Sequence, residues 1–381
     1  MEFRDLKTQY QALKTDIDNK IAEVLRSARF IAGPQVKELE EKLAKYVGVK
    51  HCITCGNGTD AITLALMTWG IGKGDAVFVP DFTFFSSGEC PALEGATPIY
   101  IDVEKHTYNI DPDKLEKAII KIRDEGKYTP KVVIAVDLFG LPADYNRIKL
   151  ICEKYGLYLL EDGAQGFGGS INGQNACSFG DISTTSFFPA KPLGCYGDGG
   201  AIFTNNDEWS AYLRSIVVHG KSGNDKYDNI CIGMNSRLDS IQAAILLPKL
   251  KAFEEYELDD VNKAASWYTN KLSGLPIVLP VVPEGFVSSW AQYTIQLSYG
   301  IDRIKLQAEL KEKGVPSMVY YMKPMHRQGA FIGTYSALAD CPETEKLCKT
   351  VLSLPIHPYL TEDDVDLVVD SLREALERQR R

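Results

Sequence analysis

The chain has 381 residues, and its 42 lysines and arginines against 51 aspartates and glutamates give a net charge of −9. This acidic balance, without a dense basic run, argues against a nucleic-acid partner. No apolar run reaches the roughly 18 residues of a membrane span, and the first residues lack the apolar stretch of a signal peptide. Hydrophobic residues make up 45% of the sequence, which is enough for a large core. We therefore expect a globular protein of the cytoplasm with no membrane contact.

Two amphipathic helices are predicted first, over residues 13–25 and 36–47, with Gly33-Pro34 between them. Short apolar runs rich in β-branched residues then alternate with helical stretches. Seven runs are predicted to be strands: residues 52–55, 76–79, 98–103, 132–138, 157–160, 183–188 and 201–204. This alternation predicts an α/β fold, with a mainly parallel central sheet covered by helices on both faces.

The second half of the chain mixes helices and strands. The spacing predicts a long helix over residues 238–272, strands over 291–297 and 315–321, a helix over 303–313 and a closing helix after Thr361. We predict a large α/β domain over residues 1–250 and a smaller α+β domain over residues 251–381.

The nine cysteines are an odd number and are scattered along the chain, which does not fit a disulfide framework. Cys52 and Cys55 form one C-x-x-C after His51. A zinc site needs a second pair of ligands at close spacing, and none follows in the sequence. We interpret this segment as a buried strand and predict no metal.

Chemistry is expected at the carboxyl ends of the strands, where open α/β sheets bind ligands. After the first strand, Gly56–Asp60 opens a helix, and the N–H groups of such a helix start suit a phosphate, although an ordinary capped helix start has the same pattern. The fifth strand ends with Glu161 and Asp162, and a carboxylate there either caps a helix or holds a positive ring nitrogen. Lys191 lies among prolines and apolar residues, where burial lowers the pKa of an amine, as a Schiff-base lysine requires. A dinucleotide fingerprint is not found, because the glycines of residues 163–168 have the wrong spacing.

These segments, in this order, resemble the DegT/DnrJ family of sugar aminotransferases, which are fold-type I enzymes that use pyridoxal 5′-phosphate. The resemblance covers almost the whole chain. It is carried by residues 5–7, 56–61, 81–84, 161–165, 186–201, 233–239, 242–244, 291–294 and 353–360.

The resemblance implies a role for each matching residue around the cofactor. Lys191 is the expected catalytic lysine, which bonds to the cofactor and later moves the proton. Asp162 is expected to pair with the pyridine nitrogen, and Gln165 to lie against the ring or its phenolic oxygen. An aromatic residue is expected to stack on the ring, either Phe84 or Phe85, and Phe85 is preferred.

The phosphate is expected to be held by Ser186, Thr59 and Asp60, the last two through backbone N–H groups. The resemblance further implies that Asn235 reaches the phosphate of a neighbouring subunit, so a homodimer with shared active sites is expected.

The implied substrates are L-glutamate and a nucleotide-linked keto sugar. The closest similarity is to aminotransferases of UDP-2-acetamido-3-keto-glucuronate, which serve O-antigen, lipopolysaccharide or related bacterial surface polysaccharides. Arg237, Tyr320, Tyr321 and His326 are the candidate substrate-binding residues. A 4-keto UDP- or dTDP-sugar stays open as an alternative, because relatives tend to read His-Tyr-Pro near Tyr320. A non-catalytic regulatory protein that binds pyridoxal phosphate is the alternative from another class.

Overall fold

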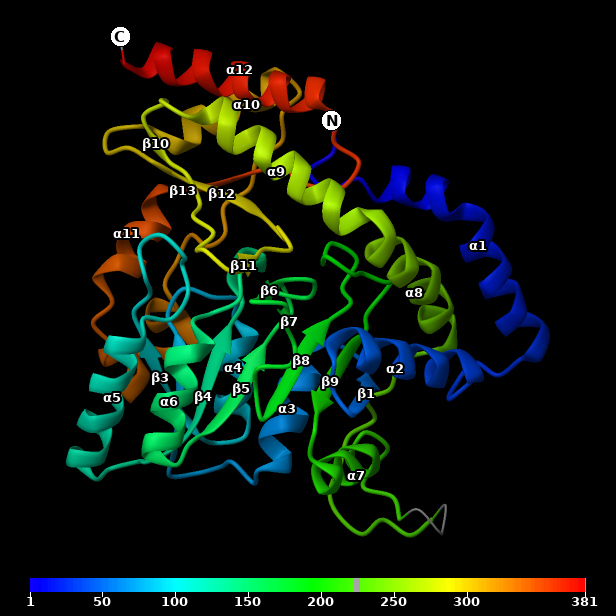
Figure 1. Cartoon of the computed structure of the whole chain (residues 1–381). Coiled ribbons are helices and arrows are strands. Elements are labelled where there is room, and N and C mark those ends of the chain that lie inside the picture. The colour runs from blue at the N-terminus through cyan, green and yellow to red at the C-terminus, as the bar shows by residue number, and fades with distance from the viewer. Residues whose placement is uncertain (223–226, 381) are drawn as a thin grey trace.

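A seven-stranded sheet forms the centre of the computed structural model, which describes residues 1–222 and 227–380 (Figure 1). Its strand order is β1-β9-β8-β5-β4-β2-β3. The strands are β1 (His51–Cys55), β2 (Asp75–Pro80), β3 (Thr97–Ile101), β4 (Thr129–Val136), β5 (Tyr158–Asp162), β8 (Ile182–Ser186) and β9 (Gly200–Thr204). These are the seven strands predicted from the sequence. Neighbours from β3 to β8 are parallel, and β9 runs antiparallel to both β8 and β1, so the predicted fold class is confirmed.

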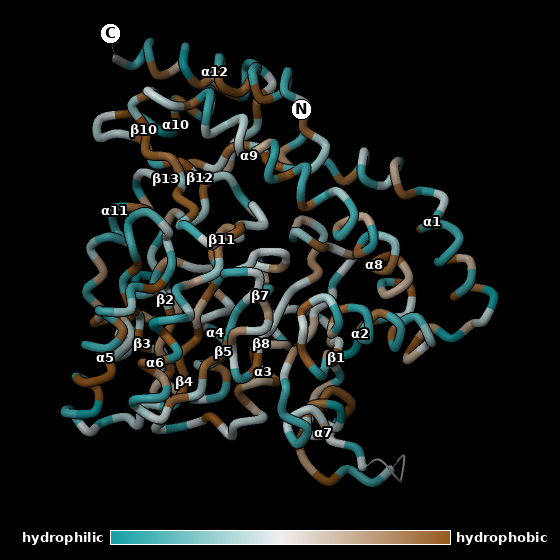
Figure 2. The backbone as a smooth tube through the Cα atoms, viewed as in Figure 1, coloured by the Kyte–Doolittle hydropathy of each residue, from teal (hydrophilic) through white to brown (hydrophobic). Residues whose placement is uncertain are grey.

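Helices cover both faces of this sheet because successive side chains of a strand point to opposite sides. In β2, Val77 packs into the core cluster that contains Leu64 of α3. The next residue, Phe78, packs into a different cluster with Ile119 of α5 and Ile148 of α6. The helices are α2 (Pro34–Val47), α3 (Gly58–Thr68), α4 (Ser86–Leu93), α5 (Pro112–Glu125), α6 (Tyr145–Tyr155) and α7 (Asp207–Ile216). Figure 2 shows the strands as the apolar centre of the chain.

A second, smaller antiparallel sheet lies in the C-terminal part of the chain. It consists of β10 (Ile277–Val278), β12 (Tyr293–Leu297) and β13 (Val351–Leu354). Its own core joins α9 (Leu258–Leu272), α10 (Arg303–Glu312) and α12 (Glu362–Arg380), with Tyr268, Tyr293 and Leu372 among the buried residues. These elements form the upper part of Figure 1.

The predicted strand over residues 315–321 is wrong. Of its residues only Met318 pairs, in an isolated bridge with Ser353. Pro316 has no N–H to give to a ladder, so the segment cannot continue the sheet at this edge.

One long helical path connects the two parts of the chain. The predicted helix over residues 238–272 is α8 (Ser240–Ala252), a π-helical turn (Phe253–Glu257) and α9. The proposed domain boundary at residue 250 falls within α8, and the division into two domains stays a prediction. At the N-terminus α1 (Leu6–Ser27) packs along α8. Among the described residues, none of the helices has the length and apolarity to span a bilayer.

Candidate active site

The ends of β1 and β8 meet at the start of α3. The N-cap residue of α3, Asn57, accepts the Asp60 N–H at 2.8 Å, and a Cβ on Gly58 would lie only 2.8 Å from Cβ of Ser186. Ser186 Oγ accepts the N–H of Phe188 at 3.2 Å, so its hydroxyl hydrogen can still be donated. The first turn of a helix presents N–H groups without intrahelical partners, and an anion fits there. The start of α3 at Thr59 and the adjacent Ser186, which we call the α3 cradle, therefore have a geometry that fits an anion.

Asp60 is placed differently from Thr59. Its N–H is taken by Asn57, and its carboxylate accepts the hydroxyl of Ser236 at 2.6 Å. The same hydroxyl oxygen accepts the N–H of Gly56 at 2.9 Å. Asp60 thus braces the loop of the cradle, and its backbone N–H has a partner already.

Asp162 ends β5 with a buried carboxylate. The hydroxyl of Ser87 donates to one oxygen at 2.9 Å, and the N–H of Ala164 donates to the other at 3.2 Å. Burial raises the pKa of Asp162, although these bonds and the charge of Lys191 oppose the shift. A buried carboxylate is stabilised in its charged form by a nearby positive charge. The site therefore fits a protonated ring nitrogen.

Lys191 lies in the loop between β8 and β9, where it is partly buried. Its backbone N–H donates to the carbonyl of Phe188 at 2.9 Å, which closes a tight turn. Burial lowers the pKa of the Lys191 amine, and the charge of Asp162 acts in the opposite direction. The structure thus brings these two predicted residues into one electrostatic environment, and the amine is easier to deprotonate than a solvent-exposed lysine.

Gln165 is fixed at both ends of its amide. The Oε1 atom accepts the N–H of Phe139 at 2.8 Å, and Nε2 donates to the hydroxyl of Tyr321 at 3.1 Å. The ring of Tyr321 lies 6.4 Å from that of Phe84, which is 54% exposed. Phe85 instead packs on Phe331, with ring centroids 5.8 Å apart. Of the two predicted aromatic residues, Phe84 therefore lies beside Tyr321, the partner of Gln165, whereas Phe85 packs on Phe331.

The remaining predicted residues do not share one location. Tyr320 is half-buried, and its ring lies 6.4 Å from that of Phe3. Arg237 lines a cleft between α2 and β1, where its buried Nε has no partner among the described residues. Asn235 is exposed, beside the buried Ser236. Tyr321 therefore reaches Gln165 within one chain, whereas Asn235 and Arg237 flank Ser236, which bonds to Asp60 at the start of α3.

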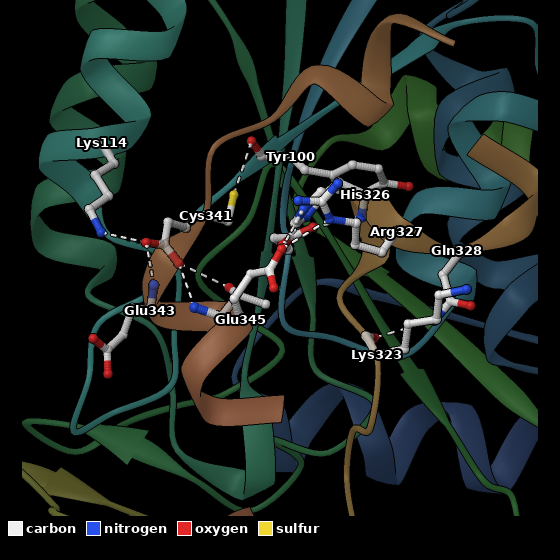
Figure 3. A network of polar contacts seen from close by, with 12 residues as sticks. Tyr100, Lys114, Lys323, His326, Arg327, Gln328, Cys341, Glu343 and Glu345 are labelled. Atoms are coloured by element: carbon white, nitrogen blue, oxygen red, sulfur yellow. Dashed lines mark hydrogen bonds and ion pairs between the residues drawn. The ribbon is translucent and has the colours of Figure 1, made fainter. Parts of the chain in front are cut away.

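His326 does not fit the substrate-binding role predicted for it, because its side chain is buried in a network of polar contacts (Figure 3). Its Nδ1 lies 2.7 Å from a carboxylate oxygen of Asp81, and its backbone N–H donates to the other oxygen at 2.8 Å. Its Nε2 lies 3.5 Å from Glu345. Asp81, beside it, raises the pKa of the imidazole. His326 thus fastens the segment after Tyr321 to the end of β2.

Asp81, His326 and Cys341 are close enough together to be examined as a metal site, since their ligand atoms lie within 4.8 Å of one another. Burial and the nearby carboxylate of Asp81 raise the pKa of the Cys341 thiol, which keeps it protonated. Asp81 and His326 also use their polar atoms on each other. Hydrogen bonding explains this cluster without a metal. Cys52 and Cys55 lie buried in β1, as interpreted from the sequence.

Comparisons with known proteins show to which sequences and structures the chain is similar. The model of the DegT/DnrJ/EryC1/StrS aminotransferase family matches residues 11–373. A UDP-2-acetamido-2-deoxy-3-oxo-D-glucuronate aminotransferase from Pseudomonas aeruginosa is 44% identical over 374 residues, covering 98% of this chain and 99% of that protein. A protein of Geobacillus stearothermophilus named a pleiotropic regulatory protein is 41% identical, with 97% of each chain covered. The crystal structure of a DegT/DnrJ/EryC1/StrS aminotransferase from Brucella abortus has a TM-score of 0.94 at 46% identity, covering 98% of this chain and 99% of that one.

Proposed function

Because the chain belongs to the DegT/DnrJ/EryC1/StrS aminotransferase family, we propose that it moves the amino group of L-glutamate onto the keto group of UDP-2-acetamido-3-keto-glucuronate. Its cofactor is pyridoxal 5′-phosphate. The observation that carries the proposal is the meeting of Lys191, Asp162 and the α3 cradle at one edge of the sheet. The sugar is proposed from the 44% identity to the Pseudomonas aeruginosa relative of that name. A place in O-antigen, lipopolysaccharide or related surface-polysaccharide synthesis in the cytoplasm is proposed on the same ground.

The residues present fit this cofactor. The helix start at Thr59 and the hydroxyl of Ser186 suit its phosphate. The buried carboxylate of Asp162 suits its ring nitrogen. The exposed ring of Phe84 offers a flat surface 6.4 Å from the ring of Tyr321, the hydrogen-bond partner of Gln165. We therefore assign the stacking role to Phe84 in place of Phe85. When bound, pyridoxal phosphate supplies an aldehyde and an electron-withdrawing ring that stabilises negative charge on the amino-acid carbon.

Lys191 performs the proton transfers in the proposed reaction. With the cofactor bound, its Nζ atom would remove the proton from the amino-acid carbon in the first half-reaction and deliver it to the carbon on the other side of the transferred nitrogen. With the keto sugar, the same amine works in reverse. A residue that is base in one step and acid in the next works best with a pKa near neutrality, and burial moves the amine of Lys191 in that direction. Asp162 keeps a proton on the ring nitrogen through its negative charge.

A homodimer with shared sites is part of the proposal. Asn235 is exposed, and the apolar side chains of Ile230 and Ile232 near it are 67% and 84% exposed. Exposed apolar residues in one segment favour contact with another protein surface. We propose that this segment meets a second copy, so that Asn235 reaches the partner's phosphate. Residues 223–226 of the loop 220–229 lie outside the described part of the chain.

The proposed function is tested by the absorbance spectrum of the purified protein before and after addition of L-glutamate alone. We expect the yellow colour of the lysine-bound cofactor, which glutamate bleaches. A coloured protein that glutamate leaves unchanged would favour another amino donor or a non-catalytic regulatory protein. The second alternative is supported by the name of the Geobacillus stearothermophilus relative. A protein that stays colourless with added pyridoxal phosphate would contradict the proposal.

The sugar is tested on the bleached protein. We expect UDP-2-acetamido-3-keto-glucuronate to restore the colour faster than its 3-keto counterpart without the carboxylate, and faster than a dTDP-4-keto-6-deoxy sugar. Faster recovery with the dTDP-sugar would establish the 4-keto alternative, and equal rates for the two UDP-sugars would remove the carboxylate from recognition.

A further inference from the structure

The N-terminal segment of the chain contacts the backbone of the Lys191 loop. Asp5 caps α1 by accepting a first-turn N–H at 2.8 Å, and Arg4 immediately precedes it. The Nη2 atom of Arg4 donates to the carbonyl oxygen of Lys191 at 3.0 Å and to that of Pro192 at 3.2 Å. One charged side chain thus holds two consecutive carbonyl groups of the loop. Hydrogen bonds from a charged donor are stronger than neutral ones.

Buried charged groups surround this arginine. Glu257, at the end of the π-helical turn, is 1% exposed and accepts hydrogen bonds from Gln9 at 2.9 Å and Tyr359 at 2.7 Å. Burial lowers the pKa of Arg4 to about 10, and the charge of Glu257 opposes the shift, so Arg4 stays charged at neutral pH. Lys249 of α8 is also buried, at 1% exposure, and its amine lies 4.8 Å from the ring centre of Tyr196, which is in the same loop as Lys191.

The same segment reaches the other side of the site. Phe3, next to Arg4, lies with its ring 6.4 Å from that of Tyr320. Tyr320 precedes Tyr321, whose hydroxyl accepts from Gln165. Residues 3–4 therefore lie between the Lys191 loop and the Tyr320–Tyr321 segment.

We propose that Arg4 is a positioning residue for Lys191: by holding the Lys191 and Pro192 carbonyls, it fixes the backbone from which the catalytic amine projects. The inference rests on the proposed function, because it takes Lys191 as the reacting amine. Displacing a reacting group by about 1 Å costs up to about 100-fold in rate. Loss of the two hydrogen bonds is therefore expected to act on the catalytic step and to leave substrate affinity nearly unchanged.

The test compares the parent holoenzyme with Arg4→Met, Arg4→Lys and the control Lys7→Met. Lys7 lies on the same segment but is exposed, where it pairs with Glu2. We expect Arg4→Met to lower kcat of the glutamate half-reaction about 10-fold, with KM within about twofold of the parent. Arg4→Lys should recover part of the loss, because an ammonium group can still donate to a carbonyl. Lys7→Met should match the parent.

A second readout does not depend on turnover. In the cofactor-free chain, trace labelling with acetic anhydride across pH, read by peptide mass spectrometry, measures the pKa of the Lys191 amine. We expect Arg4→Met to raise this pKa toward the ordinary lysine value, because a loosened loop exposes the amine to water. An unchanged labelling pKa together with an unchanged kcat in Arg4→Met would overturn the proposal.

The remaining outcomes also test the proposed role of Arg4. If Arg4→Met fails to fold, Arg4→Gln takes its place, because its shorter neutral amide cannot replace the two charged hydrogen bonds, and parental values of both kcat and the labelling pKa in that variant would overturn the proposal. Equal losses in Lys7→Met would overturn it as well. If glutamate does not bleach the parent, the proposed function fails, while the labelling comparison still tests the link between Arg4 and Lys191.

Discussion

The hydroxyl of Ser87, in the first turn of α4, donates a hydrogen bond at 2.9 Å to the carboxylate of Asp162 at the end of β5. Both side chains are buried, at 0% and 5% exposure. The bond stabilises the charged form of Asp162 and so opposes the effect of burial on its pKa. The proposed function needs this carboxylate charged, which makes Ser87 a contributor to the site that no sequence motif indicated.

We expect Ser87→Ala to raise the pKa of Asp162 further and to slow the glutamate half-reaction about 10-fold, since a hydrogen bond to a charged group contributes about 1.5–3 kcal/mol. Stopped-flow absorbance between pH 5 and 8 measures the effect, and the loss should be largest at the acidic end. Ser86→Ala is the matched control, because Ser86 is a buried neighbour on the same helix. Equal rates in the two variants would contradict the role given to Ser87.

Asp162→Asn should slow the same half-reaction by about 100-fold or more, because the ring nitrogen loses its anionic partner. The cofactor-free variant should at the same time unfold less readily than the parent at pH 8. The reason is that a carboxyl whose pKa is raised on folding destabilises the folded state as pH rises through that pKa. Urea unfolding at pH 5 and pH 8 measures both free energies of unfolding. A stability difference that does not grow with pH would show that burial of this charge is not costly.

Lys191→Ala should retain pyridoxal phosphate only non-covalently and lose amination by about 1,000-fold or more, because removal of a general acid–base group costs about 100- to 10,000-fold. Its fold should be intact by circular dichroism. The measurements are the shift of the visible absorbance band and the single-turnover rate with L-glutamate. Substantial turnover in this variant would remove Lys191 from the reaction.

Alanine substitutions of Phe84 and Phe85 distinguish a residue that contacts the cofactor from one that packs in the core. Phe84→Ala should weaken pyridoxal phosphate binding about 10-fold, since aromatic stacking contributes about 0.5–1.5 kcal/mol beyond the burial of its area. Phe85→Ala should instead lower the free energy of unfolding by about 3 kcal/mol, because its ring packs on Phe331. Fluorescence titration with the cofactor and urea unfolding of both variants test the assignment. The reverse pattern would restore Phe85 as the stacking residue.

Lys249→Met should stabilise the protein most below pH 8. Burial lowers the pKa of Lys249 to about 8 from an ordinary value of 10.5, so the folded state binds fewer protons than the unfolded state between these values. The free energy of unfolding of the parent therefore increases relative to that of the variant as pH rises from 8 to 10.5, by at most about 3 kcal/mol. Unfolding measured at pH 7, 8.5 and 10 gives the difference. A constant difference across this range would show that Lys249 does not titrate there.

The sequence predicted the large sheet because each of its strands is a short apolar run, and such runs are visible without knowledge of their partners. It also indicated Lys191 and the two acidic residues at the end of β5 as candidates, since glycine, proline and acidic residues mark strand ends locally, and the family resemblance selected Asp162 from the two acids. Ser87 and Arg4 were not predicted as contributors to the site. Their partners lie 75 and 187 residues away in the chain, and only the folded backbone brings them together.

Two errors have the same origin. The predicted strand at 315–321 has the apolar content of a strand, but strand formation depends on a partner edge, and only Met318 finds one. His326 was expected at the substrate because it lies near Tyr320 and Tyr321 in the sequence. The fold turns its side chain instead onto Asp81, a contact that spans 245 residues. Composition and spacing report which side chains are available, whereas the direction in which each points depends on tertiary packing.

The position of β1 in the sheet has a consequence for the folding of the protein during its synthesis on the ribosome. Among the described strands, β1 (His51–Cys55) pairs only with β9 (Gly200–Thr204), so its edge stays open until almost 150 further residues have been made. At roughly 5–20 residues per second, this delay is on the order of ten seconds. During that time the apolar strand Cys52-Ile53-Thr54-Cys55 has no hydrogen-bonded partner strand, and the part of the sheet that α3 covers is incomplete. Nascent chains of this length are therefore the stage at which a holdase chaperone would have the most to protect.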